Sequence, residues 1–168
     1  EKSFILPIKN FVNESYCRDI SSKVRSHQRI KREKGEFIGA YAPYGYCKDP
    51  DGNLIIEPKE AAVVRRIFEA YLGGMGSYTI AQSLQKEGIP TSRKSNGWQE
   101  GTVKEILKNP VYEGDLLLQK TCTTEGIPFR TKRNHGELPQ YLIRDNHEPI
   151  ISREEAEAVR KLCTYRKE

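Results

Sequence analysis

The chain has 168 residues and a formal net charge of +5 at pH 7, with 36% hydrophobic and 30% charged residues. That length can bury a hydrophobic core in one or two domains, and the composition is that of a globular protein. No apolar run approaches the roughly 18 residues of a transmembrane helix, and the apolar start is too short for the core of a signal peptide. The first residue is not Met, so we expect a piece of a longer protein.

The sequence contains no recognisable metal or catalytic motif. Its four cysteines are scattered without a C-x-x-C pair, and its three histidines do not complete a metal-ligand spacing. No serine lies in a G-x-S-x-G elbow, and no glycine-rich loop carries the Lys-Ser/Thr of a Walker motif. We therefore expect free thiols in a reducing cytoplasm, no metal, no cofactor and no catalytic residue.

Residues 10–34 are expected to form one long helix. Apolar residues recur at every fourth position from Val12 through Tyr16 and Ile20 to Val24, with no internal Gly or Pro. So narrow a stripe on so long a helix needs a partner to cover it. Two interpretations stay open: the helix forms a dimer or joins two domains, or it packs on its own domain.

The positive charge of the chain is concentrated at the end of this helix. Between Lys23 and Lys34 there are six Lys or Arg and one Glu, a local balance of +5, and the residues on either side each sum to zero. Gly35 is expected to cap the helix, and residues 35–46 follow as an arm of Gly, Ala, Tyr and Pro without a regular period. A basic cluster followed by a thin arm predicts binding to a polyanion, most simply DNA.

Several short elements are expected after the arm. In chain order they are a turn at 49–53, a strand at 54–56 and helices at 58–72, 77–87 and 100–109. Pro58 fits a first helical turn, Ser77 is a good N-cap, and Gly73 and Gly88 are stop signals. Trp98 is expected to anchor the loop before the last of these helices in the core.

The helices at 77–87 and 100–109 resemble the core of a helix-turn-helix. Their connector has about ten residues, whereas the standard motif has three or four. A plain helical hairpin with a solvated loop fits the pattern equally well, and both interpretations stay open.

After the last of these helices the sequence becomes strand-like. Residues 112–120 and 140–144 are strand-like and can pair, and a basic loop between them resembles a wing, although solvation alone would also explain its charge. Ser152 and Glu155 form a capping box that opens a final helix. We predict an α+β, mainly helical fold with a long N-terminal helix, a helix-turn-helix-like core and a small antiparallel β-sheet or hairpin.

An ordered set of short stretches resembles the large serine recombinases. The stretches are residues 16–25, 34–39, 42–46, 61–68, 80–91, 98–114 and 147–151. Each is a weak signal alone, but together they cover most of the chain in the order found in that family.

The resemblance implies a domain organisation. In that family a catalytic domain with a nucleophilic serine precedes a long helix, a recombinase domain and a zinc-ribbon domain. The resemblance covers only the middle of this arrangement. It implies that residues 1–34 end the linking helix, residues 35–56 form an arm with a short strand, and residues 57–168 form the DNA-binding recombinase domain with its helix-turn-helix-like core and β-hairpin flap.

The resemblance also implies a function. The chain would recognise attachment-site DNA for the integration, excision or transposition of a mobile element, in the bacterial nucleoid or encoded by a phage or transposon. It would not be active on its own, because the catalytic serine domain and the zinc-ribbon cysteines are absent from these residues. The full-length protein would be a dimer on double-stranded DNA and a tetramer in the synapse.

We predict four groups of DNA contacts. Phosphate contacts are expected at Arg25, Arg29, Lys31, Arg32 and Lys34. The arm is expected to follow the minor groove at Gly35, Phe37, Gly39, Tyr41 and Pro43. The helix at 100–109 is expected to enter the major groove with Thr102, Lys104, Glu105 and Lys108, flanked by Arg93, Lys94, Ser95 and Asn96. The wing would add Arg130, Lys132 and Arg133.

Other functions remain open at this point. A helix-turn-helix transcriptional regulator that binds operator DNA would share the basic helix and the helix at 100–109. An RNA-binding module could use the basic helix as well, with a preference for single strands or A-form duplexes. A nuclease is disfavoured, because the sequence lacks metal ligands and paired carboxylates.

Overall fold

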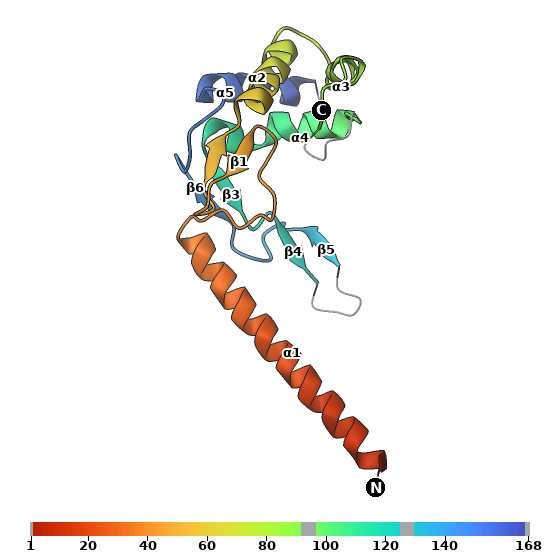
Figure 1. The fold of residues 1–168 in the computed structure, drawn as a ribbon. Helices are drawn as coiled ribbons and strands as arrows, with labels where there is room; N and C mark the ends of the chain where they lie inside the picture. The colour runs from red at the N-terminus through yellow and green to blue at the C-terminus, as the bar shows by residue number, and fades with distance from the viewer. Residues whose placement is uncertain (1, 92–96, 125–129, 167–168) are drawn as a thin grey trace. The chain divides into compact units, whose positions relative to one another are not determined.

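The computed structural model describes residues 2–91, 97–124 and 130–166. This part of the chain divides into two compact units, one up to Ile38 and one from Gly39 onward. The elements confirm the expected class, an α+β and mainly helical fold in which short antiparallel strand pairs accompany the α-helices (Figure 1). In these ranges no helix is long and apolar enough to cross a membrane, and no group of three His, Cys, Asp or Glu is placed to hold a metal.

The first unit contains the long helix α1 (Lys2–Glu33). The helix begins at Lys2, so the expected start near residue 10 was wrong and Pro7 lies inside the helix. The apolar repeat continues one turn before Val12, to Ile8, and Pro7 does not interrupt the helix. The side chains of the apolar stripe are all exposed: Val12, Tyr16, Ile20 and Val24.

Gly35 ends α1 as expected. Its φ of 75° lies in the left-handed region that glycine adopts without strain. The Gly35 amide donates to the Arg32 carbonyl and the Glu36 amide to the Lys31 carbonyl, each at 3.0 Å. These two bonds are the Schellman pattern, which satisfies carbonyls that the helix would otherwise leave unpaired.

A small hairpin opens the second unit. It pairs β1 (Tyr46–Lys48) with β2 (Leu54–Ile56), with Tyr46 opposite Ile56. The turn between them is closed by a bond from the Gly52 amide to the Asp49 carbonyl, 3.0 Å. The expected turn and second strand are confirmed, whereas β1 was missed because three residues within an aperiodic arm carry no strand pattern.

Three helices form the larger part of the core of the second unit, and all three were predicted from the sequence. They are α2 (Pro58–Leu72), α3 (Ser77–Lys86) and α4 (Glu100–Lys108). The expectation that Ser77 caps α3 was wrong: Gly76 is the N-cap, and Ser77 is the buried first residue of the helix. Gly88, with φ 69°, ends α3 as expected, and the Ile89 amide donates to the Leu84 carbonyl at 3.1 Å.

The segment after α4 differs most from expectation. Residues 112–120 do not form one strand, because the 3-10 helix η1 (Pro110–Glu113) buries Val111 and Tyr112 and only β3 (Leu116–Leu118) is extended. The predicted pairing is confirmed, since β3 lies antiparallel to β6 (Tyr141–Ile143). The basic loop between them, which resembled a wing in the sequence, contains a second antiparallel pair, β4 (Thr121–Thr123) with β5 (Thr131–Arg133).

The last helix, α5 (Arg153–Tyr165), begins with the predicted capping box. The Glu155 amide donates to the Ser152 hydroxyl at 3.2 Å, and the Ser152 amide donates to the Glu155 carboxylate at 2.9 Å. In Figure 1, α2, α3, α4 and α5 gather on one side of the second unit, and β4 and β5 extend away from them.

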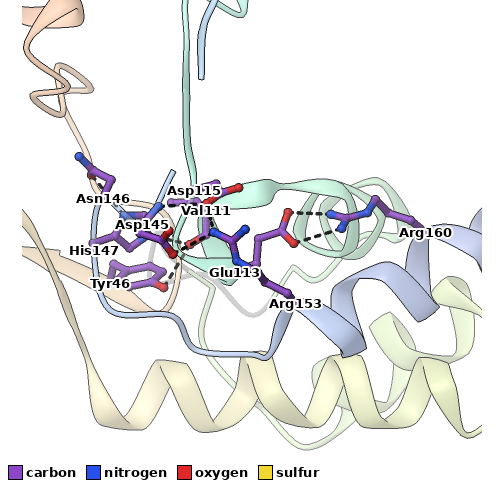
Figure 2. Close-up of polar contacts among 9 residues, drawn as sticks. All are labelled: Tyr46, Val111, Glu113, Asp115, Asp145, Asn146, His147, Arg153 and Arg160. Atoms are coloured by element: carbon purple, nitrogen blue, oxygen red, sulfur yellow. Dashed lines mark hydrogen bonds and ion pairs between the residues drawn. The ribbon is translucent and has the colours of Figure 1, made fainter. Parts of the chain in front are cut away.

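The segment at 147–151 is bonded along η1. The amides of Ile150 and Ile151 both donate to the Tyr112 carbonyl, at 3.0 and 3.1 Å. The His147 Nε2–H donates to the Val111 carbonyl at 2.7 Å, and the Tyr46 hydroxyl contacts the Val111 carbonyl at 3.2 Å (Figure 2). Strand β1, η1 and the segment before α5 therefore meet at one point.

Two acidic side chains attach α5 to this junction of β1, η1 and the segment at 147–151. Glu113 makes a bidentate pair with Arg160, with N–O distances of 2.7 and 3.1 Å, and Asp115 pairs with Arg153 at 2.8 Å (Figure 2). Both carboxylates are buried, with side-chain exposures of 8% and 10%. Buried carboxylates require such partners, so these pairs fix the position of α5 against η1 and β3.

Gly45 gives a test of how tightly this part of the core is packed. Gly45 has φ 93°, and a Cβ there would lie 2.9 Å from Ile150 Cδ1 and 3.0 Å from Val64 Cγ2. Gly52 has a similar φ of 89° but open space around it. Both Gly→Ala changes add about 1–2 kcal/mol of backbone strain, and Gly45→Ala should lose about 1–3 kcal/mol more through overpacking. Urea unfolding followed by the fluorescence of Trp98 measures the difference, and equal losses in the two variants would contradict this packing.

His147 predicts a pH dependence of stability. Burial lowers the pKa of His147 from its ordinary 6.5, against the opposing effects of its bond to Val111 and the charge of Asp115. The folded protein thus favours the neutral ring, so the free energy of unfolding is highest above pH 6.5 and falls as the pH drops from there through the folded pKa. His147→Gln keeps a hydrogen-bond donor but does not titrate, so its free energy of unfolding should fall less than that of the unsubstituted protein as the pH drops. Urea unfolding of both proteins between about pH 8 and about pH 5 tests this; identical pH profiles would rule it out.

Candidate nucleic-acid interface

Helix α4 has one side in the core and the opposite side in solvent. Its buried side chains are Val103, Ile106 and Leu107. With 3.6 residues per turn, the positions furthest from these form an outer row, spaced i, i+4 and i+7. The outer row of α4 consists of Gly101, Glu105 and Lys108, all of which are exposed. The predicted interface residue Thr102 is also exposed and lies beside this row.

Lys104 lies on the other flank of the outer row. Its ammonium group contacts the Glu100 carboxylate one turn earlier, at 2.8 Å. Such partly exposed i,i+4 pairs contribute only about 0.3–0.5 kcal/mol. The ammonium group can therefore exchange this carboxylate for a phosphate oxygen at little cost.

Lys120 brings a further cation to α4 from outside the helix. It lies between β3 and β4, and its ammonium group donates to Asn109 Oδ1, just beyond the end of α4, at 2.8 Å. Burial lowers the pKa of Lys120, and the charge of Glu105 acts in the opposite direction. Lys120 therefore adds a cation just beyond the C-terminal end of α4. Nothing in the sequence pattern indicated this position, because it depends on how the chain turns after β3.

The strands β4 and β5 form a basic ribbon. The register places Thr121 opposite Arg133 and Thr123 opposite Thr131, so one face carries hydroxyl groups and a guanidinium, all exposed. On the other face Lys132 pairs with Glu137 at 2.7 Å, which raises the pKa of Lys132 and lowers that of Glu137 to about 2. Arg130 is exposed just before β5. Guanidinium and hydroxyl groups are common phosphate ligands, so the first face suits a nucleic-acid backbone.

Asn134 fixes the base of this ribbon. Its side chain is buried, and its amide nitrogen donates to the Gln119 carbonyl at 3.0 Å and the Leu138 carbonyl at 2.7 Å. Its amide oxygen accepts from the Gly136 and Leu138 amides, at 3.0 and 3.2 Å. Gln119 has φ 61°, so the chain turns sharply between β3 and β4 at the point that Asn134 holds. The direction of the ribbon is therefore set by hydrogen bonds more than by apolar packing.

The arm leaves the core at a well-anchored position. The Tyr44 hydroxyl donates to the Pro90 carbonyl at 3.1 Å, and its ring meets the Trp98 ring edge-on with centroids 5.3 Å apart. Burial raises the pKa of Tyr44 to about 12. Trp98 is buried, as expected for a core anchor. Before Tyr44, Tyr41 is 90% exposed, and the Lys48 ammonium donates to the Gly39 carbonyl.

The basic cluster of the first unit has its own geometry. Arg25, Arg29 and Arg32 are spaced i, i+4 and i+7 and so share one face of α1. Arg29 pairs with Glu33 at 2.9 Å, and the Lys31 ammonium lies 3.6 Å from a Glu36 carboxylate oxygen. Three guanidinium groups on one face of a helix end suit contacts to successive phosphates.

The structure brings together some of the predicted site residues. Thr102, Lys104, Glu105 and Lys108 share the exposed side of α4, joined by Lys120, which the predicted site did not include. The ribbon carries Arg130, Lys132 and Arg133. The phosphate-binding set Arg25 to Lys34, with Gly35 and Phe37, belongs to the first unit, and Gly39, Tyr41 and Pro43 begin the second. Arg93, Lys94, Ser95 and Asn96 lie outside the described residues.

Comparison with known proteins gives one family and two similar structures. A family model described as Recombinase matches residues 58–166. A structure from work on the sequence requirements of the Listeria innocua prophage attP site shares the fold, with a TM-score of 0.57 and 20% identity over 83% of this chain. A crystal structure of an LSR–DNA complex matches with a TM-score of 0.55 and 18% identity, also over 83% of this chain. The match covers only 50% and 38% of those two chains.

Asn134 provides a test of the ribbon. Asn134→Ala leaves several backbone groups at the turn without partners and should lower the free energy of unfolding by about 2–3 kcal/mol. Asn53→Ala, in the exposed turn between β1 and β2 where the Asn53 side chain bonds only Asp49, should lose about 1 kcal/mol or less. Urea unfolding compares the two, and amide exchange at residues 119–123 should speed up only in Asn134→Ala. Equal losses would show that the ribbon does not depend on this side chain.

Proposed function

Because this chain belongs to the Recombinase family, we propose that it is a DNA-binding region that recognises attachment-site DNA for a site-specific serine recombinase. The observation that carries the proposal is the exposed side of α4, where Lys104 and Lys108 from the helix and Lys120 from the β3–β4 turn surround one surface. A surface built from one helix with cations on its borders suits the major groove of a duplex.

The proposed contacts have two different roles: cations bind phosphates, and the outer row of α4 faces the bases. Lys104, Lys120 and the arginines of α1 bind phosphates, which supplies affinity without regard to sequence. The outer row of α4 faces the base edges and supplies the preference for one sequence. The ribbon face with Arg133 adds phosphate contacts beside the groove, and its fixed direction keeps those contacts in register with α4.

The arm has the composition of a minor-groove segment. Gly39 and Tyr41 are exposed at its start, and the anchored Tyr44 holds its end in the core. Small residues allow a close approach to the groove floor, and the exposed Tyr41 ring can pack on the sugar–phosphate wall. In this proposal the arm is the minor-groove segment that joins α1 to the second unit along the chain.

The finer parts of the proposal rest on the resemblance seen in the sequence. The α3–α4 pair acts as a helix-turn-helix-like reader, α1 links to a catalytic domain, and residues 57–168 act as the recombinase domain. The full-length protein integrates, excises or transposes a mobile element in the bacterial cytoplasm, as a dimer on DNA and a tetramer in the synapse. The exposed apolar stripe of α1 supports pairing of two such helices.

Lys104 and Lys161 form a matched pair for testing the α4 surface. Each makes an i,i+4 ion pair of 2.8 Å, Lys104 with Glu100 on α4 and Lys161 with Glu157 on α5. Lys104→Ala should weaken duplex binding and reduce the slope of log K against log salt concentration by about 1, and Arg29→Ala should do the same. Lys161→Ala should change neither the affinity nor the slope.

The measurement is fluorescence anisotropy on labelled duplexes at several salt concentrations, with RNA as competitor. A similar loss of duplex affinity in Lys104→Ala and Lys161→Ala would show that α4 is not part of the interface. Displacement of the duplex by equal amounts of single-stranded RNA would overturn the proposed function itself.

A further inference from the structure

The centre of the proposed DNA-facing surface is acidic. Glu105 is the middle residue of the outer row of α4, on the side opposite the buried Val103, Ile106 and Leu107. Lys104 and Lys108 lie to one side of it, and Lys120, which donates to Asn109 just beyond the helix, is close enough for the charge of Glu105 to affect its pKa. A carboxylate is thus placed where a groove-binding helix comes closest to the bases.

Local ion pairing does not account for this carboxylate. Lys104 is paired with Glu100, and Lys120 donates to Asn109. None of the ion pairs between described residues includes Glu105. Facing the phosphates of a duplex, an unpaired carboxylate would be repelled and would lower the affinity for every sequence alike. It would remain favourable only where a hydrogen-bond donor meets it.

The major groove offers such a donor on cytosine. The exocyclic amino group of cytosine, N4–H₂, is the base-edge partner that carboxylates accept from, whereas guanine presents only acceptors there. Adenine also presents an amino group, N6–H₂, but its neighbouring N7 is an acceptor that repels a carboxylate. A carboxylate in the outer row would therefore favour a cytosine and disfavour a guanine at the same position. The flanking lysines would hold the helix on the phosphates while the carboxylate discriminates.

Gly101 supports the same orientation of α4. It lies one turn before Glu105 in the outer row, and a Cβ added there would meet nothing within 4 Å. Its φ is not in the left-handed region, so neither backbone conformation nor packing requires glycine. Glycine weakens a helix relative to alanine. A bare backbone on the exposed row allows close approach by another molecule, which the isolated fold does not need.

We propose that the outer row of α4 is a base-reading element, in which the Glu105 carboxylate accepts a hydrogen bond from a cytosine amino group and Gly101 lets the helix approach the groove floor. This inference rests on the proposed function and adds to it the identity of one base and the residue that reads it.

The test is a selection from a randomised duplex library with the 168-residue chain and with Glu105→Gln. The unsubstituted chain should enrich a sequence with cytosine at one position, and Glu105→Gln should reduce the preference for cytosine there by about tenfold. Glu100→Gln is the control, since it removes the same charge from the same helix at a position paired with Lys104. It should change affinity for all sequences alike and keep the preference.

The outcomes separate the inference from the proposed function. If the chain enriches a sequence and Glu105→Gln enriches the same one, with only a uniform gain in affinity, Glu105 is a repulsive charge and the inference falls while the proposed function stands. If the chain enriches no duplex sequence at all, both fall.

Gly101→Ala provides a second test, because it should raise stability and lower DNA affinity. Because alanine favours the helix and meets no neighbour, the variant should unfold at a higher urea concentration than the unsubstituted chain. It should nevertheless bind the selected duplex several-fold more weakly, because the added methyl group separates the helix from the bases. Unchanged or tighter binding by this more stable variant would overturn the role of Gly101.

Discussion

The attachment of residues 147–151 to the 3-10 turn η1 is the constraint on which the second unit depends. Three carbonyl groups, those of Val111, Tyr112 and Glu148, receive bonds from Tyr46, His147, Ile150 and Ile151, and these residues come from distant parts of the chain. Next to this point, Glu113 and Asp115 are buried and bind the arginines of α5. Because η1 directly follows α4 and directly precedes β3, whatever fixes η1 also fixes the helix and the ribbon on its two sides.

The residues of the proposed interface are polar and exposed, whereas the residues behind them are buried and hydrogen-bonded. Buried Val103, Ile106 and Leu107 hold α4 in the core, whereas Lys120 and the base of the ribbon are positioned by hydrogen bonds of Asn109 and Asn134. A DNA-facing surface must remain hydrated and charged before it binds, so it cannot be held by burying its own side chains. In this molecule the necessary rigidity comes from the residues directly behind it.

The sequence predicted α2, α3, α4 and α5, but it misplaced the start of α1 and did not predict the junctions between elements. The helices α2, α3 and α4 follow from a 3.6-residue apolar period with Pro and Gly at their ends, and the capping box of α5 from two residues. By contrast, η1 has four residues and β4 and β5 have three each, which is too short for a periodic pattern of apolar residues to appear. The candidate residues of α4 could be named from their position opposite the apolar face. Lys120 and Asn134 could not, because their roles depend on the left-handed turn at Gln119 and on partners distant in sequence.

The division of the β-structure into separate two-stranded pairs has a consequence for the protein before it meets DNA. In the described chain each strand pairs with one other strand, so every pair has outer edges that no further strand covers. Such edges can recruit strands from other copies, and natural proteins often protect them with charged side chains. The sequence of β5, Thr-Lys-Arg, places charged side chains of this kind at an edge, with Lys132 paired to Glu137 and Arg133 on the opposite face. A duplex presents phosphates and no strand edge, so it is attracted by the same side chains that prevent self-association.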